Sequence, residues 1–129
     1  MRPRLDAVAI TSADFAKTVA FYECIGFAFP EFGPEDQHLE PVTQEGEARL
    51  MIDHVDLTLK LTGKTPKPPS HSIFALLCDS PSQVDEIATR IKSTGGTVKT
   101  DPWDAFWGQR YATVVDPDGY EVDLFAPLV

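Results

Sequence analysis

The chain has 129 residues and a mass of 14.2 kDa, which suits one globular domain with a single core. Its 20 acidic residues against 11 lysines and arginines give a formal net charge of −9, which excludes nucleic acid as a partner because phosphate binding needs clustered cations. No apolar run reaches the roughly 20 residues of a membrane span. Since the two cysteines lack metal-type spacing, we expect a cytoplasmic protein with reduced thiols and no membrane partner.

The first half of the chain predicts a strand, a helix and three further strands. Residues 5–10 form a short apolar run typical of a strand. A helix follows, with apolar residues at helical spacing and a stop at Gly26. The further strands are expected at 39–44, 48–52 and 54–61, the last of them from its clear alternation of apolar and polar residues.

A proline-containing segment over residues 62–70 predicts a linker, because proline denies a backbone donor to a sheet. Beyond it the order of elements repeats, with a strand at 72–78 and a helix that begins after the N-cap Ser80 and stops at Gly95. A tryptophan-containing loop is expected after residue 100, and a tight turn at 116–119. The last three strands are expected at 97–100, 111–115 and 121–125.

This order predicts an α+β fold built from two βαβββ repeats, over about 5–61 and 72–125, in a single domain that spans residues 1–129. The stop glycines Gly26 and Gly95 lie about seventy residues apart, a spacing that suggests duplication. One helix covers one face of each repeat. The free faces would form a curved mixed sheet with an open trough, which needs a ligand, a metal or a partner chain.

Five short motifs, spread over the whole chain, carry a family resemblance. They are AVAI at 7–10, FY at 21–22, IGF at 25–27, DPDG at 116–119 and VDL at 122–124. Together they resemble the vicinal oxygen chelate superfamily, which comprises glyoxalase I, extradiol dioxygenases, fosfomycin-modifying enzymes and bleomycin resistance proteins. Residues 102–112 and 122–128 are similar to drug-sequestering members of that superfamily. The resemblance implies the paired-repeat fold and a homodimer that completes the trough.

The enzymes of this superfamily hold a divalent metal through histidine and glutamate on four inward-facing strands. The resemblance places those ligand positions at Ala7, Ser72, Asp123 and, on the remaining strand, Asp56 or Thr58. Alanine coordinates nothing, and serine is a poor ligand for metals that favour imidazole. His71 is one residue out of register and would face the other way. We therefore expect no metal, no other cofactor and no catalytic residue.

Trp103, Phe106 and Trp107 are the strongest candidates for ligand contact. Their spacing would place three rings on one face of a helical turn, and core packing is the usual explanation for such a group. Pro102 and Gly108 instead indicate a loop, and loops lie on the surface. An exposed aromatic wall accepts a planar ligand by stacking, which contributes about 1 kcal/mol per ring pair beyond burial.

Alternation along the strands predicts which side chains face the trough. On the last strand Asp123 faces inward, whereas Val122 and Leu124 pack beneath the helix. The other inward side chains are expected to be Ala7, Ala9, Thr11, Ser72, Phe74, Leu76, Glu121 and Phe125.

Four further residues are candidates for ligand contact, although each could instead have an ordinary structural or surface role. His38 and Asp53 would orient the ligand, Asp123 would supply a polar contact or a counter-charge, and Phe32 would close the trough from a partner chain. The alternatives are a strand-end imidazole, solvated carboxylates and core packing. The candidate ligand-binding residues are therefore Phe32, His38, Asp53, Trp103, Phe106, Trp107 and Asp123.

These features predict non-catalytic binding and sequestration of a planar aromatic antibiotic of the mitomycin, bleomycin or enediyne type, conferring self-resistance. The alternative is a metal-dependent lyase or isomerase of the glyoxalase type with an atypical metal site. A third possibility is an unliganded structural or regulatory protein. A stoichiometric metal would favour the enzyme, and an absence of ligand-induced tryptophan quenching would favour the third.

Overall fold

The computed structural model describes residues 2, 4–64 and 73–129 of the chain. Its contacts divide the chain into two compact units, Met1–Pro66 (unit 1) and Lys67–Val129 (unit 2), and each unit is described by itself. The predicted α+β class is confirmed, with two mixed sheets and three helices among the described residues. None of the described helices is long and apolar enough to span a membrane.

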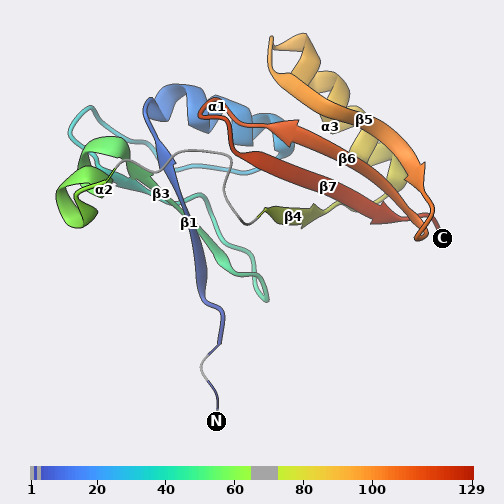
Figure 1. Cartoon of the computed structure of the whole chain (residues 1–129), viewed down its shortest axis with the longest axis horizontal. Coiled ribbons are helices and arrows are strands. Elements are labelled where there is room, and N and C mark those ends of the chain that lie inside the picture. Colours follow the sequence, from blue (N-terminus) through green and yellow to red (C-terminus); the bar gives the residue numbers. More distant parts are fainter. Residues whose placement is uncertain (1, 3, 65–72) are drawn as a thin grey trace. The chain divides into compact units, whose positions relative to one another are not determined.

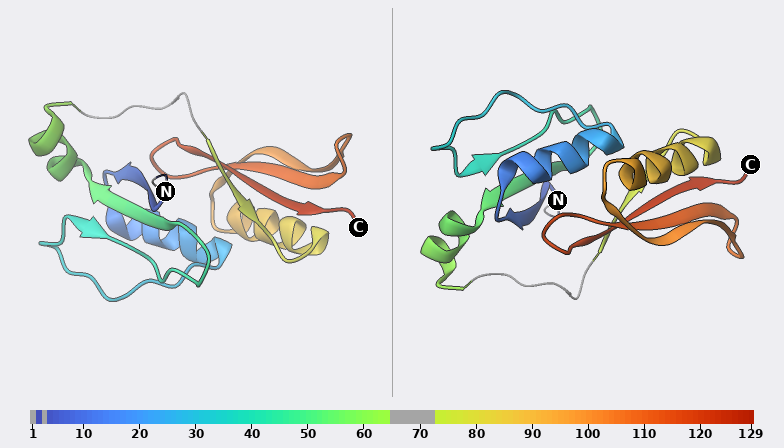
Figure 2. Two further views of the ribbon diagram at one scale, coloured as in Figure 1. Left: turned by 90° about the horizontal axis from the view of Figure 1, so that it is seen from below. Right: turned by 90° about the horizontal axis from the view of Figure 1, so that it is seen from above.

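Unit 1 contains a three-stranded sheet in the order β1-β3-β2. Strand β1 (Ala7–Ser12) runs parallel to β3 (Arg49–His54), and the short β2 (His38–Leu39) is antiparallel to β3. Helix α1 (Phe15–Ile25) lies against this sheet (Figure 2). The side chain of Asp14 accepts a hydrogen bond from the Lys17 N–H and so caps the start of α1.

The core of unit 1 lies between α1 and one face of the sheet. Val8, Ile10, Leu50 and Ile52 share this face by their register, and Ile52 is fully buried. The helix contributes Phe15, Val19, Phe21, Tyr22 and Ile25. The opposite face of the sheet therefore carries Ala7, Ala9, Thr11, Arg49, Met51 and Asp53.

Two predictions for unit 1 are wrong, and the βαβββ order is therefore not seen there. The segment predicted as a strand at 54–61 forms helix α2 (Val55–Thr62), because the His54 ring caps its start by accepting from the Asp56 N–H and Gly63 ends it at φ 73°. The strand predicted at 39–44 is reduced to β2, since Pro41 has no N–H for a ladder. Helix α2 also takes in Thr62, the first residue of the predicted linker, and residues 65–70 of that linker lie outside the described residues.

Unit 2 contains the predicted strand, helix and three strands. Its sheet has the order β4-β7-β6-β5, with β4 (Phe74–Leu77) parallel to β7 (Glu121–Pro127) and the other neighbours antiparallel. Figure 1 shows α3 (Pro81–Ser93) along one face of the sheet and the β5–β6 turn beside the C-terminus. As predicted, Ser80 caps α3 by accepting from the Gln83 N–H, with Pro81 at its first position.

The core of unit 2 lies between α3 and the sheet. The stripe predicted on the helix is buried, and so are Val122 and Leu124 on β7, as alternation predicted. From the helix the core takes Val84, Ile87, Ala88 and Ile91, and from β6 and β7 it takes Ala112, Val114, Val122, Leu124 and Ala126. The sheet face away from α3 is the one that carries Tyr111, Thr113, Asp123 and Phe125.

The region around Trp103 differs from its prediction. Strand β5 (Thr97–Ala105) continues past residue 100 and contains Trp103, so the predicted four-residue strand is too short and the predicted loop begins only at Phe106. Shifts in the register with β6 (Gln109–Val115) between Val98 and Thr100, and between Thr100 and Trp103, let this strand accommodate Pro102.

Candidate ligand-binding site

Three strands of unit 2 place aromatic rings side by side on the sheet face away from α3. Tyr111 on β6 is the register partner of Trp103 on β5 and of Phe125 on β7. The rings of Tyr111 and Phe125 are stacked, with centroids 6.2 Å apart and planes inclined by 26°. Register partners share a face, so this row of rings crosses the sheet from its edge to its interior. We call Trp103, Trp107, Tyr111 and Phe125 the ring row.

Trp107 joins the ring row from the turn between β5 and β6. Its ring packs edge-to-face on Trp103 at 5.5 Å and on Tyr111 at 5.3 Å, and its Nε1–H donates to Gln109 Oε1 over 2.8 Å. Trp103 and Trp107 keep 40% and 47% of their surface exposed. Two indoles that are held in place yet half exposed present a preformed apolar surface to a ligand.

Phe106 lies at the tip of the same turn and is 91% exposed. It packs edge-on against Trp107 with ring centroids 4.9 Å apart. The helical turn weighed for Trp103, Phe106 and Trp107 does not form, and the predicted loop is limited to residues 106–108. These rings instead meet through a hairpin loop of three residues that closes with Gly108 at φ 91°, as such loops commonly do.

The structure also corrects the prediction for β4. Phe74 and Leu76 are register partners of Val122 and Leu124, so they lie on the helix side of the sheet. Ala75 and Leu77 are paired with Asp123 and Phe125 and lie on the face of the ring row, where Leu77 is 68% exposed. The prediction was one residue out of register, and a shift of one residue reverses the face. Ser72, predicted to face inward, lies outside the described residues.

Asp123 lies beside the ring row and is almost fully buried. Its Oδ2 accepts a hydrogen bond from the Tyr111 hydroxyl over 2.6 Å, and its Oδ1 accepts one from Thr113 Oγ1 over 2.7 Å. Burial, and then the hydrogen bond to this carboxylate, raise the pKa of Tyr111 to about 12. Tyr111 is therefore a neutral donor throughout the physiological range.

The described residues do not suit the metal that the family resemblance implies. Ala7 offers no donor atom, and Asp123 already accepts hydrogen bonds from two hydroxyl groups of its own sheet. Over residues 2, 4–64 and 73–129, no three His, Cys, Asp or Glu side chains gather in a way that could hold an ion. Asp56 and Thr58, expected on a strand, lie in helix α2. Ser72 and His71 lie outside these ranges.

In unit 1 the structure brings two predicted residues, His38 and Asp53, into direct contact. His38 Nδ1 lies 2.6 Å from Asp53 Oδ1, and its Nε2 lies 2.8 Å from Glu40 Oε2. The hydrogen bonds to Glu40 and Asp53 raise the pKa of His38 above its ordinary value. Arg49 extends this network through two ion pairs, from its Nη1 to Glu40 and from its Nη2 to Asp6. The sheet face away from α1 therefore carries a polar network at His38, Asp53, Glu40 and Arg49.

Phe32, the last predicted residue, lies in unit 1. It packs edge-on against Phe15 at the start of α1, with ring centroids 6.1 Å apart, and is 37% exposed. Phe15 in turn packs on the ring of His54. Within unit 1, Phe32 thus packs against a core residue, and core packing was the alternative to ligand contact for this residue.

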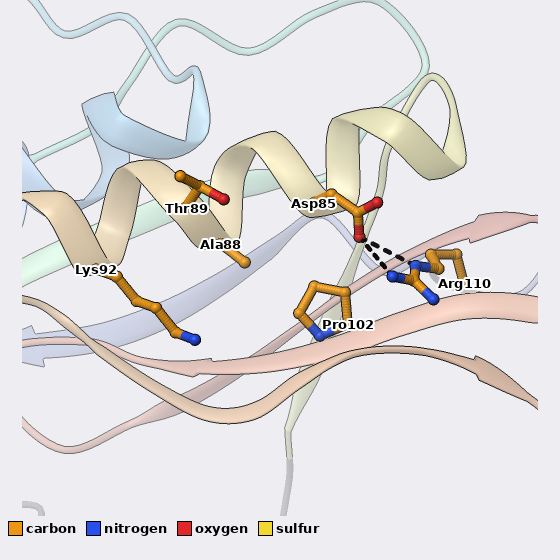
Figure 3. Close-up of a pocket in the computed structure, with 6 residues that line it drawn as sticks. All are labelled: Asp85, Ala88, Thr89, Lys92, Pro102 and Arg110. Carbon is orange, nitrogen blue, oxygen red and sulfur yellow. Dashed lines mark hydrogen bonds and ion pairs between the residues drawn. The ribbon is translucent and has the colours of Figure 1, made fainter.

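A hollow of about 190 Å³ lies on the helix side of unit 2, away from the ring row. It is lined by Asp85, Ala88, Thr89, Lys92, Pro102 and Arg110 (Figure 3). Arg110 bonds Asp85 through Nε and Nη2 and Asp104 through Nη1, each over 3.0 Å, and Lys92 pairs with Asp101. Because these cations are already paired with acids of the unit, the hollow offers little to a charged ligand.

Sequence reasoning missed Tyr111 as a member of the site. Alternation along 111–115 would have placed Tyr111 and Thr113 on one face, yet only the register with β7 shows that this is the face of Asp123. Glu40 was also missed, although it lies only two residues after His38. Arg49 was missed because it lies on another strand and meets Glu40 only in the fold.

The described residues form an α+β fold with two mixed sheets, and the sheet of unit 2 carries the ring row on its face away from α3. Residues 4–124 match the family model described as the Glyoxalase/Bleomycin resistance protein/Dioxygenase superfamily, and the chain belongs to that superfamily. No curated protein gives a significant match.

Solved structures of this superfamily share the fold at low sequence identity. A family enzyme from Burkholderia phytofirmans PsJN has a TM-score of 0.80 and 18% identity, covering 98% of this chain and 100% of that one. A glyoxalase/bleomycin resistance protein/dioxygenase from Nocardioides has a TM-score of 0.73 and 21% identity, covering 99% and 85%. The lactoylglutathione lyase of Agrobacterium tumefaciens has a TM-score of 0.70 and 19% identity, covering 97% and 94%.

Proposed function

We propose that this protein binds a planar aromatic small molecule on the ring row of unit 2 and holds it without chemical change. The carrying observation is the set of contacts that joins Trp103, Trp107, Tyr111 and Phe125 into one surface with two half-exposed indoles. Offset and edge-on packing of a ligand on such rings contributes about 1 kcal/mol per pair in addition to apolar burial.

The ligand class that fits best is an antibiotic of the mitomycin, bleomycin or enediyne type, and binding would confer self-resistance by sequestration. Support comes from the resemblance of residues 102–112 and 122–128 to drug-sequestering members of the superfamily, since these two ranges contain the whole ring row. In this proposal the protein acts in the cytoplasm as a homodimer, His38 and Asp53 orient the ligand, and Phe32 closes the site from a partner chain. The acidic surface would favour capture of a cationic drug.

The test is a titration of intrinsic tryptophan fluorescence with mitomycin C, bleomycin and an enediyne chromophore, with the drug analysed afterwards. We expect saturable quenching at one drug molecule per protein chain. The drug recovered afterwards should be chemically unchanged. Metal analysis and an assay with a small α-oxo substrate accompany it. A tightly held transition metal together with turnover would establish the glyoxalase-type enzyme instead, and no quenching by any compound would reject ligand binding on these indoles.

A further inference from the structure

Asp123 contacts the ring row through one specific atom. Its Oδ2 accepts the hydrogen bond of the Tyr111 hydroxyl at 2.6 Å, while Thr113 occupies Oδ1 at 2.7 Å. Asp123 is 9% exposed, and among the described residues the two hydrogen bonds of its carboxylate come from β6, the neighbouring strand. A ligand on the ring row would therefore meet an acid whose oxygens are already engaged.

Tyr111 is the central ring of the row. Trp107 packs edge-on against it at 5.3 Å, and Phe125 stacks on it at 6.2 Å. At one end the ring is attached to β6, and at the other its hydroxyl is held by Asp123. Fixing both ends of the ring leaves it little freedom to tilt, and a ring that is fixed before the ligand arrives loses little conformational entropy on binding.

We propose that Asp123 is a positioning residue of the ligand site, which acts through the Tyr111 hydroxyl to hold the central ring of the row. This inference rests on the proposed function and assigns Asp123 a role other than a direct polar contact or a counter-charge. Because the ligand meets the ring and not the acid, a neutral planar ligand depends on Asp123 as much as a cationic one.

Substitutions of Asp123 separate positioning from direct charge contact. Asp123→Asn keeps an oxygen that can accept from Tyr111 and an amide that can donate to Thr113, whereas Asp123→Ala removes both bonds. Mitomycin C serves as the neutral probe and ethidium as the planar cation. We expect Asp123→Ala to weaken both by about five- to tenfold, and Asp123→Asn to restore most of the affinity for both.

Two further measurements tie the effect to Tyr111. Tyr111→Phe should weaken both probes to a similar degree, and adding Asp123→Ala to it should cause little further loss because the two residues act as one unit. Ultraviolet titration of the phenols should show that the Tyr111 group, identified by its loss in Tyr111→Phe, ionises near pH 12 in the wild type. In Asp123→Ala, this group should titrate at lower pH and yet above its ordinary value, since its burial remains. Thr113→Val, which leaves the Tyr111 bond intact, is the matched control and should bind nearly as the wild type does.

The results distinguish failure of this inference from failure of the proposed function. A wild-type protein that binds neither probe overturns the proposed function and the inference with it. Wild-type binding that Asp123→Ala leaves unchanged overturns the inference alone. So does an Asp123→Asn variant that loses only ethidium, because that pattern reports a counter-charge. Melting curves of each variant show that it is folded, and Asp123→Asn keeps the test informative where the alanine variant fails to fold.

Discussion

His38 and Asp53 are register partners on β2 and β3, and their side chains are joined by a hydrogen bond of 2.6 Å between Nδ1 and Oδ1. The second nitrogen of the same ring reaches Glu40 at 2.8 Å. An imidazole with a carboxylate at each nitrogen is best satisfied when it is protonated and donates twice. This relationship gives unit 1 a charged centre on the sheet face away from α1.

The free energy of unfolding should therefore depend on pH through His38. The bonds to Glu40 and Asp53 raise its pKa above the ordinary 6.5, so the folded protein binds the proton more tightly than the unfolded chain does. The stabilisation is fully present below pH 6.5 and is lost as pH rises through the pKa of the folded state. Urea denaturation of the wild type and His38→Gln, between about pH 5.5 and 9, should show a stability difference that shrinks with rising pH. A difference that grows with pH would contradict the assignment.

Trp103→Ala should weaken binding of the planar ligand by at least tenfold, which corresponds to about 1.4 kcal/mol. The indole lies in a strand at the edge of the sheet and is 40% exposed, so its removal should leave the fold intact. Lys92→Ala is the matched control, since Lys92 lines the hollow on the helix side of the same unit. Fluorescence of Trp107 reports the titration of Trp103→Ala, and fluorescence of both tryptophans reports that of Lys92→Ala. Equal losses in the two variants would mean that the ring row is not the binding surface.

The elements that could be predicted from sequence are those with strong local signals. Helix α3 has a capping serine, a proline at its first position and an apolar stripe that is buried in the structure. The turn at 116–119 forms as expected, with the Gly119 N–H donating to the Asp116 carbonyl. In these places local preference and packing agree.

Helix α2 could not be predicted because its pattern carries no packing information. Val55, Leu57, Leu59 and Leu61 alternate as in a strand, yet no residue of the helix is buried within unit 1. Because α2 has no buried face, the spacing of its apolar residues does not distinguish a helix from a strand. The capping residues His54 and Gly63 mark where the helix begins and ends. The ring row was found only in part for a related reason, since Tyr111 joins it through strand pairing.

Two leucines on opposite faces of the unit 2 sheet should differ sharply in their contribution to stability. Leu124 on β7 is fully buried beneath α3, and Leu124→Ala should lower the free energy of unfolding by about 3 kcal/mol through lost burial and the cavity left behind. Leu77 on β4 lies on the other face, and Leu77→Ala should cost less than about 0.5 kcal/mol. Urea denaturation measures both. A large loss for Leu77→Ala would show that its face is covered in solution, as a homodimer or a bound ligand would require.

The turn that presents Trp107 should depend on Gly108. Its φ of 91° is one that side-chain-bearing residues rarely adopt, although no atom lies within 4 Å of where a Cβ would be. Gly108→Ala should therefore cost about 1 kcal/mol through backbone strain alone. Gly33→Ala is the matched control, because Gly33 has equally open surroundings without a positive φ. We expect the ligand affinity of Gly108→Ala to fall as well, since Trp107 packs on Trp103 and Tyr111 only when this turn is formed. A stable Gly108→Ala protein with wild-type affinity would show that the loop can supply the same ring positions by another backbone path.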